Sequence, residues 1–304
     1  MTSINTNNAA MGALETLRGI NSNLQKTQDA VSSGYRISKA SDNAAYWSIA
    51  TTMRSDDSAM SAVSDALGLG AAKVDTAYTG MTSAIDVVTS IKSKLVAASE
   101  DGVSKSDLQD DISQLQDQLL AIAQSGSFSG QNWLAASGGN TASVVSSFVR
   151  DASGGVSIKS TSYTFSTGSA GNVLFGASGI TVTTTSGILG TAYSSASGYS
   201  VYSLDISNMT DGQIGGALSM VESALSTMTE AASRLGSLSS RIDLQTSFTS
   251  SLKDSVEAGI GKLVDADMEE ESSKLSALQT QQQLAIQSLS IANSSSQSIL
   301  SLFR

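Results

Sequence analysis

The sequence predicts a mainly α fold: a long coiled-coil-like helical bundle formed by both chain ends, with a small Ser/Thr/Gly-rich β region in the middle. Three observations lead to this fold class. Apolar residues recur every three or four positions over both ends of the 304-residue chain. Between about 126 and 207, Gly, Ser and Thr dominate and the apolar residues alternate or cluster briefly. Proline, which would interrupt a long helix, is absent.

The first helix is predicted over residues 1–33. Leu17, Leu24 and Val31 lie seven residues apart, so they fall on one face of a helix that packs in coiled-coil fashion. Gly34 follows directly, and glycine is common after a last helical turn because it adopts the left-handed backbone conformation without strain. The sequence therefore predicts a helix end at this glycine.

Three further helices are predicted at about 45–98, 106–124 and 210–258, each from sustained spacings of three and four between apolar residues. Two of the helix starts carry a serine or threonine three residues before a glutamine, which is the spacing of a capping box: Ser106 with Gln109, and Thr210 with Gln213. Between the last two helices, the brief apolar clusters of residues 126–207 predict short strands and hairpins.

A terminal helix is predicted within residues 260–304. It carries apolar residues at the same spacing: Leu275, Leu278, Leu289, Ile299 and Phe303. Each terminal helix is amphipathic and separate from the main bundle, so neither can bury its apolar face alone. We expect both to be disordered in the monomer and to become ordered by packing against other copies.

The segment 34–44, between the first two helices, is predicted to be non-helical. Ser41 or Asp42 can cap the helix that follows it. The two basic residues of the segment are expected to bridge neighbouring subunits rather than to bind a ligand. For the two aromatic residues just beyond it, packing in the core or at an interface is favoured over a ligand-binding face. The candidate contact residues are Gly34, Arg36, Lys39, Asp42, Tyr46 and Trp47.

The composition argues against several classes of function. A net charge of −10 argues against a nucleic-acid-binding protein and against docking onto an anionic membrane. The sequence has no His and no Cys, which removes the usual zinc and copper sites, cysteine nucleophiles and His-containing triads. We therefore expect no enzyme, no cofactor and no metal. The N-terminus lacks the apolar stretch of a secretory signal peptide, and no segment is apolar for long enough to span a membrane.

An acidic run precedes and begins the terminal helix: Asp265, Asp267, Glu269, Glu270 and Glu271. Such a run can hold a cation, but negative charge near a helix start also stabilises the helix macrodipole and solvates the surface. We favour this second interpretation. Pairing of these carboxylates with Arg or Lys of another subunit is the alternative.

The chain closely resembles bacterial flagellin at four places. The stretch VSSGYRI at 31–37 continues to DNAA at 42–45, the stretch FSGQNWL occupies 128–134, DADM occupies 265–268, and the chain ends SLFR. The resemblance covers roughly residues 1–135 and 210–304, and the short middle is similar to that of alphaproteobacterial flagellins. It implies a structural subunit that self-assembles into the extracellular flagellar filament, a helical propeller for motility.

The resemblance also implies a domain organisation and partners. Residues 1–33 and 260–304 would form the inner tube of the filament, 34–44 a non-helical spoke, and 45–259 a rod domain, with the outer variable domains nearly absent. The partners would be further copies of the chain, sister flagellins, the filament cap, hook-associated proteins, an export chaperone and the type III exporter, with no cleaved signal peptide. A hook–filament junction protein, which shares both flagellin ends, is the alternative function.

Two sets of site residues follow from the resemblance. The polymerisation seam would consist of Leu17, Leu24, Val31, Leu275, Leu278, Leu289, Ile299 and Phe303. The family presents an Arg, a Leu and a Glu to a mammalian Toll-like receptor, and the matching positions here are Ile91, Leu95 and Gln114. Both charged contacts are lost at these positions, so weak receptor activation is expected.

Overall fold

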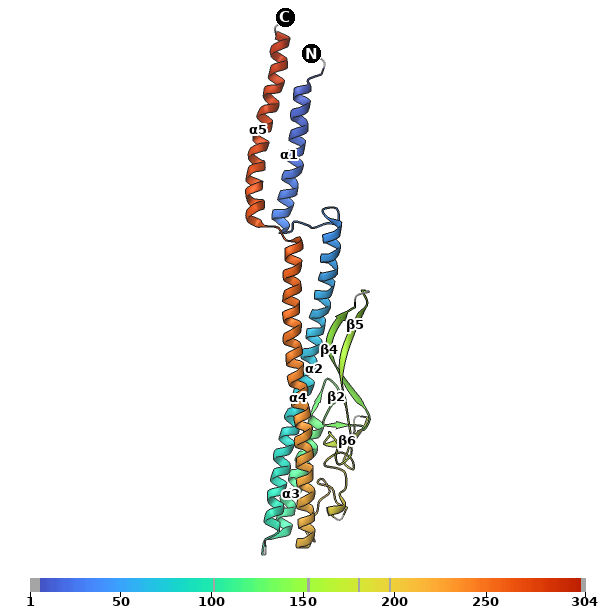
Figure 1. Cartoon of the computed structure of the whole chain (residues 1–304). Coiled ribbons are helices and arrows are strands. Elements are labelled where there is room, and N and C mark those ends of the chain that lie inside the picture. The colour runs from blue at the N-terminus through green and yellow to red at the C-terminus, as the bar shows by residue number, and fades with distance from the viewer. Residues whose placement is uncertain (1–5, 101, 152–153, 180, 197, 302–304) are drawn as a thin grey trace. The chain divides into compact units, whose positions relative to one another are not determined.

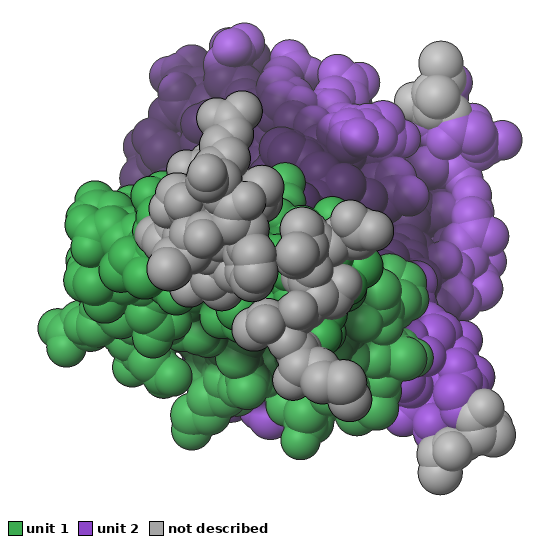
Figure 2. All heavy atoms as spheres, turned by 90° about the horizontal axis from the view of Figure 1, so that it is seen from above, with its two compact units in different colours: residues 1–58, 253–304 green, residues 59–252 purple. Residues whose placement is uncertain are grey.

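The computed structural model describes residues 6–100, 102–151, 154–179, 181–196 and 198–301. The chain groups into two compact units, which Figure 2 shows in different colours. Unit 1 contains both chain ends, residues 1–58 and 253–304, and unit 2 contains residues 59–252. Long helices and a small strand-containing middle account for the described residues (Figure 1), which confirms the mainly α fold class.

Unit 1 is built around two terminal helices that pack side by side, α1 (Asn8–Ser33) and α5 (Met268–Ser301) (Figure 1). At the start of α1, the Asn7 side chain accepts a hydrogen bond of 3.0 Å from the Ala10 amide. At its end, Gly34 has a φ of +73°, and its N–H donates to the Ala30 carbonyl. The predicted helix end at Gly34 is confirmed.

Three helices contribute to the core of unit 2: α2 (Ala44–Ala98), α3 (Lys105–Ser125) and α4 (Asp211–Val264). The side chains that form this core are the apolar residues that recur at spacings of three and four, such as Leu67, Ile112 and Met228. The helix predicted to end at 258 continues to Val264. Because α2 and α4 are so long, each contributes residues to both units.

The start of α3 differs from the predicted capping box. Ser104, not Ser106, accepts the hydrogen bond from the Asp107 amide at 3.4 Å. Gln109 is used elsewhere: its side chain accepts from the Ile206 amide at 2.8 Å. The prediction failed because a glutamine three residues into a helix can serve a tertiary contact as well as a cap.

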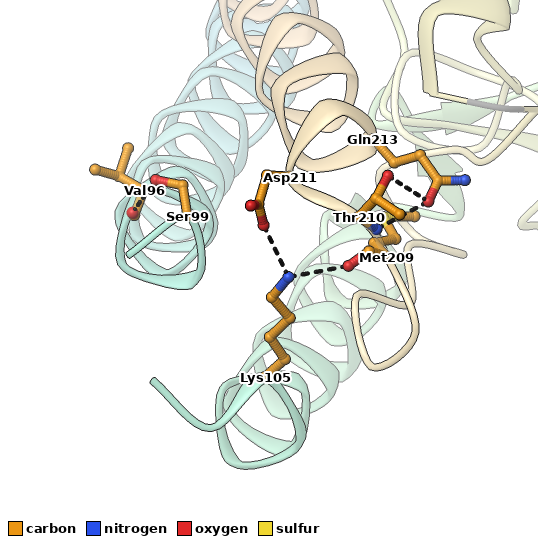
Figure 3. Close-up of polar contacts among 7 residues, drawn as sticks. All are labelled: Val96, Ser99, Lys105, Met209, Thr210, Asp211 and Gln213. Atoms are coloured by element: carbon orange, nitrogen blue, oxygen red, sulfur yellow. Dashed lines mark hydrogen bonds and ion pairs between the residues drawn. The ribbon is translucent and has the colours of Figure 1, made fainter. Parts of the chain in front are cut away.

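The start of α4 keeps half of its predicted capping box (Figure 3). The Gln213 side chain reaches back and accepts from the Thr210 amide at 2.9 Å, and the Thr210 hydroxyl donates to the same oxygen at 3.1 Å. Lys105 of α3 closes this end of the bundle, because its ammonium group donates to the Met209 carbonyl at 3.0 Å and pairs with Asp211 at 3.1 Å.

The described residues of the middle region form three small sheets. The strands are β1 (Ser127–Phe128), β2 (Gln131–Asn132), β3 (Ala135–Ala136), β4 (Thr141–Arg150), β5 (Val156–Thr164), β6 (Phe175–Ser178) and β7 (Thr181–Thr183). Two of the sheets are antiparallel pairs, β1–β2 and β4–β5, while β6 lies between β7 and a parallel partner, β3. The prediction of short strands and hairpins is therefore right for β4–β5 and incomplete for β3, which pairs across a long connection.

The described residues of the segment 184–210 form no strand. Their regular structure is a short 3-10 helix at Ser194–Ala196. Buried apolar side chains, including Leu189 and Leu204, attach this segment to the core. The buried Gln116 of α3 adds polar contacts, since its amide group donates to the carbonyl oxygens of Val201 and Leu204, both at 3.0 Å. Irregular backbone at the core is tolerated here because a side chain satisfies it.

Candidate assembly surfaces

The predicted polymerisation seam lies largely between α1 and α5 of the same chain. Leu278 is buried, and the other described seam residues are half-buried: Leu17, Leu24, Val31, Leu275 and Leu289. Polar contacts fix the register of the pair, because Gln282 donates to the Asn21 side chain at 2.7 Å. The Ile299 side chain and Phe303 lie outside the described residues. The two terminal helices therefore lie side by side and cover part of each other's apolar face, whereas the sequence analysis assigned the burial of these residues to contacts with other copies.

A second set of apolar residues on the same helices remains exposed. On α1, Met11 is 61% exposed, and on α5 Leu284 is 58% and Ile291 68% exposed. A groove of about 410 Å³ lies between the helices, and Leu284 is among its lining residues. The sequence analysis missed this surface because the seven-residue repeat identifies the side that meets the partner helix within the chain. Leu284 and Ile291 are also seven residues apart, so this second repeat is the signal that could have identified the surface.

The non-helical segment after Gly34 joins α1 to the end of α4. The Arg36 and Ile37 amides donate to the Val264 carbonyl at 2.8 and 3.2 Å, and the Ala266 amide donates to the Gly34 carbonyl at 2.9 Å. The Arg36 guanidinium donates to the Leu263 carbonyl at 3.0 Å. Because terminal carbonyl groups of a helix have no partner within it, this arginine caps α4 of its own chain. Arg36 thus makes a bond within its own chain, and the expected bridge to a neighbouring subunit stays a prediction.

Asp42 closes a tight turn rather than capping α2. Its carboxylate accepts hydrogen bonds from the Lys39 amide at 3.0 Å and the Ser38 amide at 3.1 Å. Both bonds lower the pKa of Asp42, because they stabilise the charged form, and the bond from Lys39 has the larger effect. Asn43 takes the capping role instead, accepting from the Ala45 amide at 3.1 Å and from the amide that follows it at 3.2 Å. The prediction of Ser41 or Asp42 as the cap was wrong by one or two positions.

The aromatic pair at the start of α2 divides between interior and surface. Trp47 is half-buried and packs against a small apolar cluster that includes Ile37, Ala50 and Val264. Tyr46 is 43% exposed. Trp47 therefore helps to hold the segment 34–44 onto the helices of unit 1, whereas Tyr46 presents an aromatic surface.

Two of the three receptor-facing positions inferred from the resemblance are wrong. Ile91 and Leu95 of α2 are completely buried in the core of unit 2, so neither can face a receptor. The physical reason is their spacing, which continues the apolar seam of α2 through Val88. Gln114 of α3 is exposed, as the inference requires.

The acidic run at the start of α5 serves the helix terminus. The Asp267 carboxylate accepts from the Glu269 amide at 3.0 Å and from the Glu270 amide at 3.2 Å, so it is the N-cap. Within the described ranges, no group of three or more His, Cys, Asp or Glu residues is placed to hold a metal ion. The described helices likewise include none long and apolar enough to cross a membrane.

Comparison with known proteins matches both ends of the chain to one family. The family model of the bacterial flagellin N-terminal helical region matches residues 4–139, and that of the C-terminal helical region matches residues 218–303. The chain belongs to the bacterial flagellin family. It is 50% identical to flagellin C of Rhizobium meliloti strain 1021, 47% to flagellin A of Rhizobium meliloti and 44% to a flagellin of Brucella melitensis, each over 100% of both chains.

Family membership establishes the function at the level of the whole chain. This flagellin is a structural subunit of the bacterial flagellar filament and acts in motility, as the sequence analysis predicted. The alternative, a hook–filament junction protein, has no better support. Flagellins of this family are structural proteins that self-assemble into an extracellular filament, and sister flagellins A to D occur in Rhizobium meliloti.

Proposed function

We propose that this flagellin polymerises through the exposed apolar side of the α1–α5 pair. The observation that carries the proposal is the exposure of Leu284 and Ile291 on α5 and of Met11 on α1. Full burial of one such side chain contributes about 1.5–3 kcal/mol, so burying several of them gives each subunit a substantial gain on entering the filament. The intrachain seam around Leu278 holds the pair together but does not supply this gain.

The proposal is tested by separating assembly from monomer stability. In the double variant Leu284→Ser/Ile291→Ser, we expect filament growth on seeds to fail, while the monomer keeps its circular dichroism spectrum and melting curve. Gln287→Ser, an exposed polar position on the same helix, is the control and should assemble normally. Leu278→Ser should lower monomer stability as well, because Leu278 is buried. Normal filaments from the double variant would refute the proposal.

We also propose the domain organisation that the resemblance implies. The inner tube would comprise residues 1–33 and the helix that starts at Met268, the spoke residues 34–44, and the rod the residues between. The break between α4 and α5 at 265–267 supports a boundary slightly later than 260. The alignment to flagellin A extends over 398 positions against 304 residues here, which supports reduced outer domains. Limited proteolysis of the monomer should cleave first at 34–44 and 265–267.

Finally, we propose the export route and partners that the family resemblance implies. These are the type III exporter, an export chaperone, the hook-associated proteins and the filament cap, with an extracellular location reached without a cleaved signal peptide. Support comes from membership of the family. N-terminal sequencing of protein from sheared filaments tests the route: a mature chain that begins well inside residues 1–33 would contradict it.

A further inference from the structure

A polar groove lies between β5 and α4, and all its lining residues belong to unit 2, not to the terminal helices on which assembly is proposed to depend. Its volume is about 520 Å³, within the usual range for small-molecule sites. The lining holds two arginines, one tyrosine, one asparagine, one leucine and five serine or threonine residues. No described carboxylate is part of this lining, although the chain as a whole carries a net charge of −10.

The positive charge of the groove comes from Arg234 and Arg241 of α4. They are seven residues apart, which places them on one face of the helix about 10 Å apart along its axis. Arg234 pairs with Glu230 on the preceding turn at 2.6 Å, and Arg241 donates to the Thr161 hydroxyl of β5. Each of these contacts uses one guanidinium nitrogen, Nη2, and a guanidinium has five N–H donors. Further donors of both arginines are therefore available to a ligand.

Tyr163, which lines the same groove, carries a buried hydroxyl group. The Tyr163 hydroxyl oxygen is buried, and no hydrogen-bond partner for it is present among the described residues. Its ring is held in place by Trp133, stacked at 5.5 Å, and by Phe165, edge-on at 5.5 Å. The neighbouring Asn172 donates to the Thr164 carbonyl and accepts from the Ser166 amide, both at 2.8 Å, and its approach to the Tyr163 hydroxyl does not reach hydrogen-bond geometry. A buried donor without a partner is costly, so this hydroxyl is suited to a ligand that accepts a hydrogen bond.

We propose that this groove binds a small oxyanion, a phosphate or carboxylate group, through the two guanidinium groups and the Tyr163 hydroxyl. Arginine presents its N–H groups in a planar fork that matches the oxygens of phosphate and carboxylate. Burial raises the pKa of Tyr163, and the positive charge of Arg234 and the Asn172 side chain offset this only in part, so at neutral pH the hydroxyl keeps its proton and donates. The serine and threonine hydroxyls around it supply further donors.

The chain contains its own reporter for this site. Trp133 stacks on Tyr163 and is 2% exposed, so its emission responds to the tyrosine while collisional quenching by dissolved ions stays small. The sequence has two tryptophans, and Trp47→Phe leaves Trp133 as the single tryptophan, which is excited selectively over the tyrosines. In this background, the full-length monomer is titrated with sodium phosphate and, separately, with sodium acetate, at an ionic strength held constant with sodium chloride.

We expect a saturable change in emission with phosphate or acetate. The variant Arg234→Gln/Arg241→Gln should weaken the affinity at least about tenfold, because two charge-assisted contacts are lost. Tyr163→Phe keeps the ring stack but removes the donor, and should weaken it about fivefold. The matched control Lys92→Gln/Lys94→Gln removes the same charge from two exposed ion pairs of unit 2 and should bind like the parent chain.

Three outcomes would overturn the proposal: a linear response equal to that of chloride, unchanged affinity in the arginine double variant, or equal weakening in the lysine control. The arginines are exposed, so their replacement should leave the fold intact, which circular dichroism checks. Comparison of the phosphate and acetate curves then distinguishes the two oxyanion classes. Filament formation is measured in parallel; because the groove is separate from the terminal helices, the two proposals fail independently.

Discussion

The close approach between α2 and the β region predicts that two glycine-to-alanine substitutions in this helix change the free energy of unfolding in opposite directions. Leu134 is completely buried, and its Cδ1 methyl group occupies the space beside Gly80 of α2. A Cβ atom added at position 80 would lie closer than 3 Å to that methyl group, a distance that real contacts do not show. Gly126, after α3, approaches the same side chain equally closely. Leu134 therefore has no room to move away from a larger residue at 80.

The expected magnitude follows from two opposing terms. Replacing glycine by alanine inside a helix stabilises it by about 1 kcal/mol, because the unfolded chain loses conformational freedom. Adding a methyl group to a filled core costs about 1–3 kcal/mol. Gly68→Ala carries only the first term, since nothing lies within 4 Å of its added Cβ. The difference between Gly80→Ala and Gly68→Ala therefore measures the packing term, about 1–3 kcal/mol.

The assay is urea unfolding of the full-length monomer, followed by circular dichroism and by tryptophan emission. With a slope of roughly 2 kcal/mol per M, the two midpoints should differ by about 0.5–1.5 M, with Gly68→Ala the higher. In a double-mutant cycle, Gly80→Ala should cost less in the Leu134→Ala background than in the parent chain, as expected for two residues in contact. Equal midpoints for the two alanine variants would refute the inference that Gly80 is required by the contact with Leu134.

Two further predictions concern polar groups. Gln116→Leu should lower the free energy of unfolding by about 1–3 kcal/mol in the same assay, because it removes the donor to the Val201 carbonyl and one of the two donors to the Leu204 carbonyl, while the exposed Gln118→Leu should change little. For Asp42, the folded pKa lies below the unfolded value, so its turn is fully stabilised above about pH 3.9 and loses that contribution as the pH falls through the folded pKa. The amide shifts of the two donors should follow this transition in an NMR titration, and Asp42→Asn should abolish it.

The sequence predicted the helices better than their ends, and the reason is physical. A long apolar seam repeats many times, so errors at single positions do not change the result. A cap depends on one residue, and several adjacent residues are often capable of the role. At the start of α2, three consecutive positions carry capping side chains, and only the structure shows that Asn43 binds the amides while Asp42 serves a turn. A cap is therefore predictable in type but not in position.

The β region marks another limit of sequence reasoning. The β4–β5 hairpin was recognisable because its strands are long and joined by a short turn containing glycine. The parallel pairing of β3 with β6 involves two-residue contacts across a long connection, and no local pattern specifies such a partner. The segment around Leu204 has no regular structure to predict, because side chains such as Gln116 satisfy its backbone.

The terminal helices show why the assembly surface was harder to identify than the fold. A seven-residue repeat reports the neighbour that a helix meets most regularly, and here that neighbour is the other end of the same chain. Leu278 is therefore expected to contribute mainly to the stability of the α1–α5 pair, and Leu284, six residues later and exposed, mainly to contacts between subunits. Grouped exposed apolar side chains are typical of a surface that meets another molecule, which is the role proposed for Leu284. Leu278→Ser should therefore lower the melting temperature of the monomer, whereas Leu284→Ser should slow filament growth. If both variants lost both properties, the α1–α5 pair would fold only within the filament.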